Sequence, residues 1–308
     1  MTVPKAQSAR LANVHVPPAL RPGDRVAVVA PSSPLPREAS LAGLAWLAQR
    51  YALVMHGDVF ARDGFLAGDD DRRVAELSRA MRDSSVRAIV IGRGGYGATR
   101  IVGRLPWDDY ARDPKWIIGF SDVTALHVRA CRVAACVHGP NVTGLGASSN
   151  PRLAQNRGAW LAALERPHAP QVWRGLRTVR SGRASGPLFG GNLALVCAMA
   201  AAGALTVPEG AIVLLEDVTE KPYRVDRMLT SLIAGGYFER ASAVVFGSFV
   251  ECDAQADRVT VDDVIAERSS SLGIPVLAGA PFGHGPHNEA FTLGAMGTVD
   301  DGTLSWVA

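Results

Sequence analysis

A serine stands where an apolar run of the chain gives way to a helix-like pattern. Residues 116–120 form the apolar run Trp-Ile-Ile-Gly-Phe, and Ser121 and Asp122 follow it directly. Serine and aspartate at such a position often cap the helix that begins there. The turn can instead present a nucleophile, because Gly119 permits a tight strand-to-helix turn and the N–H of Asp122 can face a developing oxyanion. The fifth position of that nucleophile motif is Val123 in place of glycine, so this motif alone leaves both interpretations open.

A glutamate and a histidine further along the chain could complete a catalytic set with this serine. Glu216 ends an apolar run, and His284 lies between two glycines in "FGHG". In a serine hydrolase a carboxylate orients the imidazole, and the imidazole takes the serine proton. Each residue also has a structural interpretation, since an acid at a strand end can cap a helix and a lone histidine is more often structural. His287 follows His284 by three positions, but without a third ligand nearby we predict no metal site.

A glycine-rich loop, "IGRGGYGATR" over residues 91–100, follows another apolar run. Its Gly92, Gly94 and Gly97 have the spacing of a dinucleotide-binding loop, which also needs an acidic residue about 20 positions on, at a strand end. The acidic residues at that distance follow no predicted strand: Asp108, Asp109 and Asp113. Exposed amides of Gly94 or Gly95 could equally complete an oxyanion hole with Asp122. A plain turn is the third interpretation.

The first half of the chain alternates apolar runs with amphipathic segments. The predicted strands cover residues 26–30, 51–59, 86–92 and 115–120, and the predicted helices cover 37–50 and 69–83. Strands that are apolar throughout and separated by helices indicate a parallel sheet with both faces covered. We therefore expect the α/β class here, an N-terminal parallel-sheet domain with helices on both faces.

The pattern changes near residue 150. Residues 148–175 contain one short helix and then proline-rich, charged sequence, which is typical of a linker. After it, several short apolar runs alternate with glycine-rich turns, which indicates a smaller, β-rich C-terminal domain. We place the two domains at residues 1–168 and 169–308.

Composition narrows the class of protein. The 308 residues are 48% hydrophobic, and the formal net charge is only +3, with no basic run of the kind that binds nucleic acid. No apolar stretch is long enough for a membrane span, and residues 1–24 lack the apolar segment of a signal peptide. The four cysteines have no C-x-x-C spacing, so free thiols are expected. A cytoplasmic protein without nucleic-acid or membrane partners is the expectation.

Seven blocks of the sequence resemble the LD-carboxypeptidase family of serine peptidases, in the family's order. They span residues 23–294 and are "GDRVAVVAPSSP", "FLAGDDDRRVAEL", "GRGGYGATRIV", "IIGFSDVTALH", "GPLFGGNLALV", "LLEDVTEKPYRVDRML" and "FGHGPHNEAFTLG". The resemblance implies a Ser-His-Glu triad of Ser121, His284 and Glu216. It also implies an oxyanion hole from backbone amides, which we assign to Asp122 and to Gly94 or Gly95. The serine would belong to the N-terminal domain and the other two residues to the C-terminal domain.

The resemblance further implies a reaction, release of the terminal D-alanine from a murein tetrapeptide in cytoplasmic cell-wall recycling. It implies a homodimer and no cofactor or metal. Arg93 or Arg224 could pair with the substrate carboxylate, and Asn192 could bond the peptide backbone, although surface or capping roles fit all three. Related hydrolases inactivate peptide-nucleotide antibiotics, usually with longer C-terminal insertions, so the short chain favours the peptidase. A non-catalytic protein that binds small molecules in the cleft expected between the two domains is the other alternative.

Overall fold

The computed structural model describes residues 14–55 and 58–308. Residues 1–13, where the absence of a signal peptide was in part inferred, and residues 56–57 of the second predicted strand lie outside this description. Within the part that is described, no helix combines the length and the apolar character needed to cross a membrane.

The N-terminal sheet has six strands in the order β12-β5-β4-β3-β1-β2. Its strands are β1 (Arg25–Val29), β2 (Ala52–Val54), β3 (Val86–Ile91), β4 (Trp116–Gly119), β5 (Cys136–His138) and β12 (Phe291–Leu293). Every neighbouring pair is parallel except β12 with β5, which is antiparallel. The helical segments between and after these strands are α1 (Arg37–Ala48), α2 (Asp70–Arg82), α3 (Ala98–Ile101), η1 (Val102–Arg104), α4 (Trp107–Arg112), η2 (Ser121–Val123), α5 (Thr124–Ala130), α6 (Val142–Leu145) and α7 (Leu153–Glu165).

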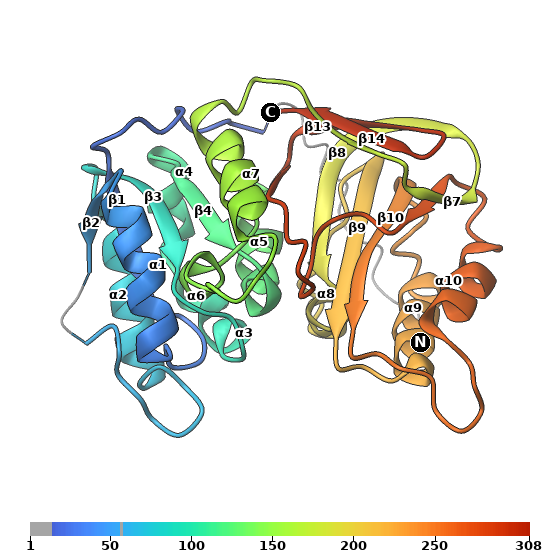
Figure 1. Cartoon of the computed structure of the whole chain (residues 1–308), viewed down its shortest axis with the longest axis horizontal. Coiled ribbons are helices and arrows are strands. Elements are labelled where there is room, and N and C mark those ends of the chain that lie inside the picture. The colour runs from blue at the N-terminus through green and yellow to red at the C-terminus, as the bar shows by residue number, and fades with distance from the viewer. Residues whose placement is uncertain (1–13, 56–57) are drawn as a thin grey trace.

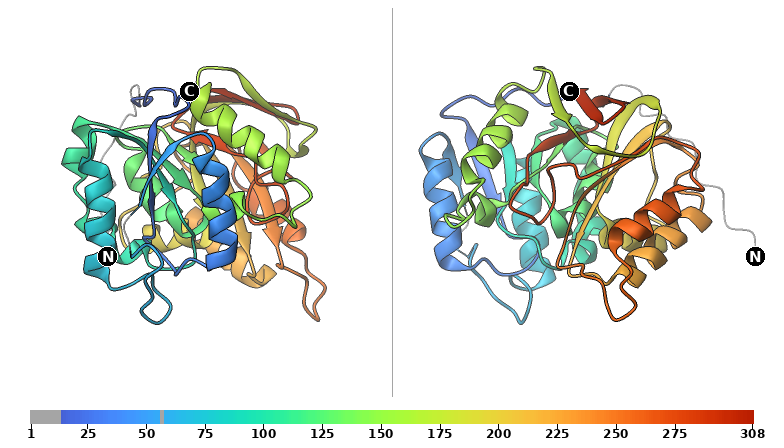
Figure 2. Two further views of the ribbon diagram at one scale, coloured as in Figure 1. Left: turned by 60° about the vertical axis from the view of Figure 1, so that its left-hand side comes forward. Right: turned by 45° about the vertical axis from the view of Figure 1, so that its right-hand side comes forward.

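Alternate residues of these strands face different helices, which is why the strands are apolar throughout. Val26 and Val28 share a buried cluster with Leu47 of α1 and with Trp160 of α7. Ala27 and Val29, which alternate with them along β1, belong to a second buried cluster, together with residues of α2, α4 and α5. Figure 2 shows α1 and α2 on opposite sides of the sheet. Burial on both faces is the arrangement that a continuous apolar strand requires.

The C-terminal sheet has eight strands in the order β6-β14-β13-β8-β9-β10-β11-β7. These are β6 (Gln171–Arg174), β7 (Arg177–Arg180), β8 (Arg183–Asn192), β9 (Ala211–Val218), β10 (Ala241–Val250), β11 (Val276–Ala278), β13 (Met296–Asp300) and β14 (Thr303–Val307). The run β8-β9-β10-β11 is parallel, and the flanking pairs are antiparallel. The helices are α8 (Leu193–Ala201), α9 (Pro222–Ala234) and α10 (Val261–Ser269), of which α9 and α10 lie on the outer side in Figure 1. The predicted α/β class with a second, more β-rich sheet is confirmed.

Two details differ from the sequence-based expectation. The second strand covers only Ala52–Val54, and its pairing with β1 ends at the Ala27–Val54 pair. The stretch predicted as a linker contains α7, whose Trp160 and Leu164 are fully buried against the N-terminal sheet. This helix is therefore part of the N-terminal layer. The division at residues 168 and 169 stays a prediction, and β12 shows that one later strand joins the earlier sheet.

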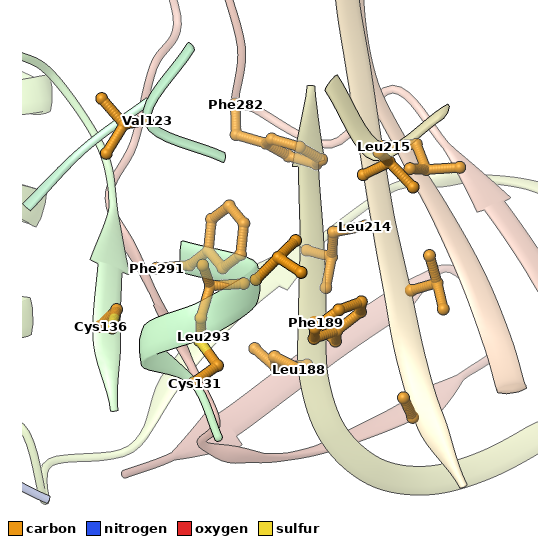
Figure 3. Close-up of a cluster of buried hydrophobic side chains, with 14 of the residues drawn as sticks. Val123, Cys131, Cys136, Leu188, Phe189, Leu214, Leu215, Phe282, Phe291 and Leu293 are labelled. Carbon is orange, nitrogen blue, oxygen red and sulfur yellow. The ribbon is translucent and has the colours of Figure 1, made fainter. Parts of the chain in front are cut away.

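The space between the two sheets is filled by a shared hydrophobic core. Figure 3 shows some of its members, which come from β5, β12 and the α5 region on one side and from β8 and β9 on the other. Phe282 and Phe291, on either side of the loop that carries His284, pack edge to face with ring centroids 5.0 Å apart. The histidine loop is thus anchored at both ends in this core.

Candidate active site

Ser121 lies in a strained turn at the end of β4. The strand ends at Gly119, η2 begins at Ser121, and the serine has a φ of +69°, a conformation that non-glycine residues rarely adopt. A Cβ at Gly119 would lie 2.7 Å from the Asn141 Oδ1 atom and 2.9 Å from the Val123 side chain. Only glycine fits there. Backbone strain of this kind costs about 1–3 kcal/mol and concentrates at functional sites.

Ser121, His284 and Glu216 form one continuous hydrogen-bonded chain. The His284 Nε2 atom lies 3.1 Å from the Ser121 Oγ atom, and the His284 Nδ1 atom lies 2.7 Å from the Glu216 Oε2 atom. Glu216 is in β9 and its side chain is fully buried, whereas the His284 side chain is 18% exposed. The nucleophile, base and orienting acid of a serine hydrolase need this geometry. The structure therefore brings the three predicted residues together, and their catalytic roles stay a prediction.

The histidine loop approaches β9 closely because it contains Gly283. This residue has a φ of +116°, and a Cβ on it would lie 2.5 Å from the Ser248 Oγ atom and 2.8 Å from the Glu216 Oε2 atom. Glycine alone combines that backbone conformation with that approach. The Gly-His-Gly sequence thus has a local physical reason.

The environment of His284 strengthens it as a base. Burial lowers the pKa of His284, but the hydrogen bond that its ring donates to Glu216 and the negative charges of Glu216 and Asp217 outweigh burial, so the pKa lies above its usual value. The Phe120 ring packs against the imidazole, with centroids 4.8 Å apart. The ring is therefore fixed on one side by an aromatic contact and at Nδ1 by a carboxylate.

The glycine-rich loop lies directly against the nucleophile. A Cβ on Gly94 would be 2.9 Å from the Ser121 Cβ atom and 3.2 Å from its Oγ atom. Asp122 is in the first turn of η2, where backbone N–H groups lack partners within the helix. Gly94 and Asp122 therefore both lie next to Ser121, one from the glycine-rich loop and one from the chain after the nucleophile. An oxyanion hole made from them stays a prediction.

The three predicted substrate contacts have other partners in the protein. Asn192 is buried and caps α8, its Oδ1 accepting from the Leu195 N–H at 3.1 Å, while its Nδ2 donates to Asp217 at 2.9 Å. Arg93 is exposed beside Gly94 and donates to the Pro34 carbonyl at 2.9 Å. Arg224 is exposed on α9 and lies 3.6 Å from Glu220. Asn192 thus has a capping role, and contacts of Arg93 or Arg224 with substrate stay predictions.

Several supporting residues were not predicted from the sequence. The Thr124 Oγ1 atom accepts from the Asn192 N–H at 3.0 Å, which joins the helix after the nucleophile to β8. Asp217 accepts from Asn192, Ala194 and Val218, and burial raises its pKa to about 6 against these hydrogen bonds. Thr124 and Asp217 lie within three positions of a predicted triad residue, and this proximity was the available signal.

The family is decided by matches over both halves of the chain. Residues 26–139 match the model of the LD-carboxypeptidase N-terminal domain, and residues 185–299 match that of the C-terminal domain. The chain belongs to the LD-carboxypeptidase family. Like the peptidases of this family, it is a serine-type carboxypeptidase.

Individual relatives of this LD-carboxypeptidase agree over nearly its whole length. The murein tetrapeptide carboxypeptidase of Pseudomonas aeruginosa is 34% identical over 294 residues, which cover 92% of this chain and 95% of the relative. The muramoyltetrapeptide carboxypeptidase of Oxalobacter formigenes superposes with a TM-score of 0.81 at 24% identity, covering 92% of this chain and 99% of that one. The microcin C7 self-immunity protein gives a TM-score of 0.88 at 20% identity, covering 96% of this chain and 98% of that one. The two structural matches show a shared fold.

Proposed function

We propose that this enzyme removes the terminal D-alanine from a murein tetrapeptide, with Ser121 as nucleophile, His284 as base and Glu216 as the residue that orients His284. The observation that carries the proposal is the hydrogen-bonded chain of 3.1 Å and 2.7 Å through the His284 ring. The 34% identity to the Pseudomonas enzyme named for this substrate supports the choice of substrate.

In the first half of the reaction the Ser121 Oγ atom attacks the carbonyl carbon that precedes D-alanine. The new C–O bond forms while the hydroxyl proton moves to His284 Nε2, and the carbonyl electron pair moves to its oxygen. The N–H groups of Asp122 and of Gly94 or Gly95 donate to that oxyanion. The C–N bond then breaks as Nε2 passes its proton to the departing amine, which leaves an acyl-enzyme and free D-alanine.

In the second half of the reaction, water takes the place of Ser121 as the nucleophile, and Ser121 becomes the leaving group. It gives a proton to Nε2 and adds to the acyl carbon, and the C–Oγ bond breaks as the proton returns to Ser121. Glu216 keeps its negative charge throughout and stabilises the imidazolium that forms twice. The full burial of its side chain makes this interaction strong, because little water screens it.

The test compares wild type with Ser121→Ala on two substrates. We expect D-alanine release from murein tetrapeptide by wild type and a loss of at least about 10⁴-fold in the variant, with unchanged folding by circular dichroism. An aminoacyl-sulfamoyl adenosine is the second substrate, because the fold is shared with the microcin self-immunity protein. Hydrolysis of that compound without D-alanine release would replace the peptidase by the antibiotic-inactivating activity.

The cellular setting is proposed from the family resemblance. We infer a cytoplasmic homodimer that acts in cell-wall recycling. Fractionation of cells and sedimentation of the purified enzyme would check the location and the oligomeric state, and a membrane-bound or monomeric enzyme would contradict the respective inference.

A further inference from the structure

The side chain of Asp122 is buried next to the nucleophile and has no part in the steps described above. The residue is 1% exposed and follows Ser121 directly. Its Oδ2 atom accepts two hydrogen bonds, from the Ser32 hydroxyl at 2.6 Å and from the Ala98 backbone N–H at 2.8 Å. The proposed mechanism uses only the backbone N–H of this residue, so the carboxylate needs its own explanation.

The two donors belong to two different loops. Ser32 is in the loop after β1, and Ala98 is the first residue of α3, at the end of the glycine-rich loop. The neighbouring Ser33 donates its backbone N–H to the Gly94 carbonyl at 3.2 Å, and its Oγ atom accepts from the Tyr96 N–H at 3.2 Å. The glycine-rich loop is therefore held at its end by Asp122 directly, and at its middle by the serine loop that Asp122 also holds.

This loop has no freedom to move without affecting the nucleophile. Gly94 approaches Ser121 so closely that even a Cβ would overlap it. A displacement of the loop by a few tenths of an ångström changes where the Gly94 and Gly95 amides point relative to Ser121. Hydrogen-bond donors of an oxyanion hole act only when they are placed in advance of the reaction.

The burial of the Asp122 carboxyl group affects its pKa. Burial raises the pKa of Asp122, and the hydrogen bonds from Ser32 and Ala98 act against that change. A buried acid that is held by two donors fixes those donors more firmly than an exposed one would, because no water competes for its oxygen.

We propose that Asp122 is a positioning residue that joins the two sides of the oxyanion hole. Its backbone supplies one amide, and its side chain fixes the loop that supplies the other. The inference rests on the proposed serine mechanism. It assigns the carboxylate no contact with substrate, so its loss acts on the transition state more than on substrate binding.

The test measures kcat and KM for D-alanine release by Asp122→Ala and Asp122→Asn beside wild type. We expect kcat to fall about 10²-fold in D122A, the effect of one misplaced oxyanion donor, with KM within about threefold. D122N should recover to within about tenfold of wild type, because an amide oxygen can accept the same two hydrogen bonds. Asp263→Ala is the matched control, since Asp263 also holds a helix start, at α10, and it should keep the wild-type kcat.

Ser32→Ala tests the same contact from the other side if D122A does not fold, and its kcat should fall about tenfold. A kcat of D122A within threefold of wild type would overturn the inference. If D122A does not fold, a kcat of S32A within threefold of wild type would overturn it instead. So would a D122N as impaired as D122A, which would assign the effect to charge. A wild type that releases no D-alanine refutes the proposed function and this inference with it, whereas an active wild type with unaffected variants refutes this inference alone.

Discussion

The two halves of the molecule contribute to the site by different physical means. The N-terminal half works through its backbone: Ser121 has a left-handed φ, and Gly119 and Gly94 allow close approach to neighbouring atoms. The C-terminal half works through buried polar side chains, with Glu216 fully enclosed and His284 held against it at 2.7 Å. Backbone conformation positions the nucleophile, whereas the negative charge of a buried carboxylate raises the pKa of its base. Changes in the two halves should therefore fail in different ways.

The largest effect is expected from the buried acid. Glu216→Gln keeps the shape but allows the wrong imidazole tautomer, so kcat should fall about 10⁴-fold. Glu76→Gln is the matched control in the N-terminal half, since Glu76 is also buried and accepts from the Ala30 N–H at 2.7 Å. Steady-state D-alanine release should show near wild-type kcat for E76Q. Equal losses in both variants would contradict the assignment.

Substituting one glycine in each half by alanine compares how the two halves respond to an added methyl group. Gly94→Ala should lower kcat about 10²-fold with little change in stability, because the added methyl displaces the loop from Ser121. Gly283→Ala should lose activity and also about 1–3 kcal/mol of stability, because its φ is positive and Glu216 blocks the methyl.

The controls for these two variants are glycines with room for a methyl group. A Cβ on Gly103 meets nothing within 4 Å, and one on Gly285 meets ordinary contacts from 3.5 Å. Kinetics together with thermal unfolding should leave G103A and G285A near wild type. Equal stability loss in G94A and G283A would remove the contrast between the halves.

The pH dependence follows from the raised pKa of His284. The enzyme needs a neutral imidazole, so kcat/KM should rise with pH through a midpoint above 6.5. Removing the charge of Glu216 leaves burial as the dominant influence, so the pKa should fall below that of wild type. NMR titration of the imidazole in S121A and in S121A with E216Q measures both values. A pKa that does not change would contradict the role of Glu216.

The same group links folding to pH. Because the pKa of His284 is higher in the folded state, its contribution to stability is present below pH 6.5 and is lost as pH rises through the folded-state value.

The smallest effect is expected where the halves meet. Thr124→Val keeps the shape but leaves the Asn192 N–H without its acceptor, which costs about 1–3 kcal/mol for a buried group. Urea unfolding measures this loss, and kcat should change less than in G94A. A variant as stable as wild type would show that this contact does not hold the halves together.

The sequence indicated the strands, the two sheets and the triad residues because these depend on local pattern and on ordered motifs. The apolar run before Ser121 and the glycines beside His284 made these residues candidates, and the ordered blocks of the family resemblance selected them as the predicted nucleophile and base. The Asn192–Asp217 hydrogen bond and the two bonds of the Asp122 carboxylate depend on residues far apart in the chain, such as Ser32, 90 positions from Asp122. No spacing rule encodes such contacts. The antiparallel pairing of β12 with β5 was likewise missed, since three residues leave too little pattern.

That short strand has a consequence for how the protein can be divided. Residues 291–293 come late in the chain, directly after the loop that carries His284. They nevertheless pair with β5, along the edge of that strand that β4 leaves free. A fragment that ended before them would expose an unpaired strand edge, and such edges recruit other chains. The halves are therefore not interchangeable modules. A chimera built by exchanging C-terminal halves between relatives would also exchange a piece of the recipient's first sheet, and its success would depend on how well that borrowed strand fits.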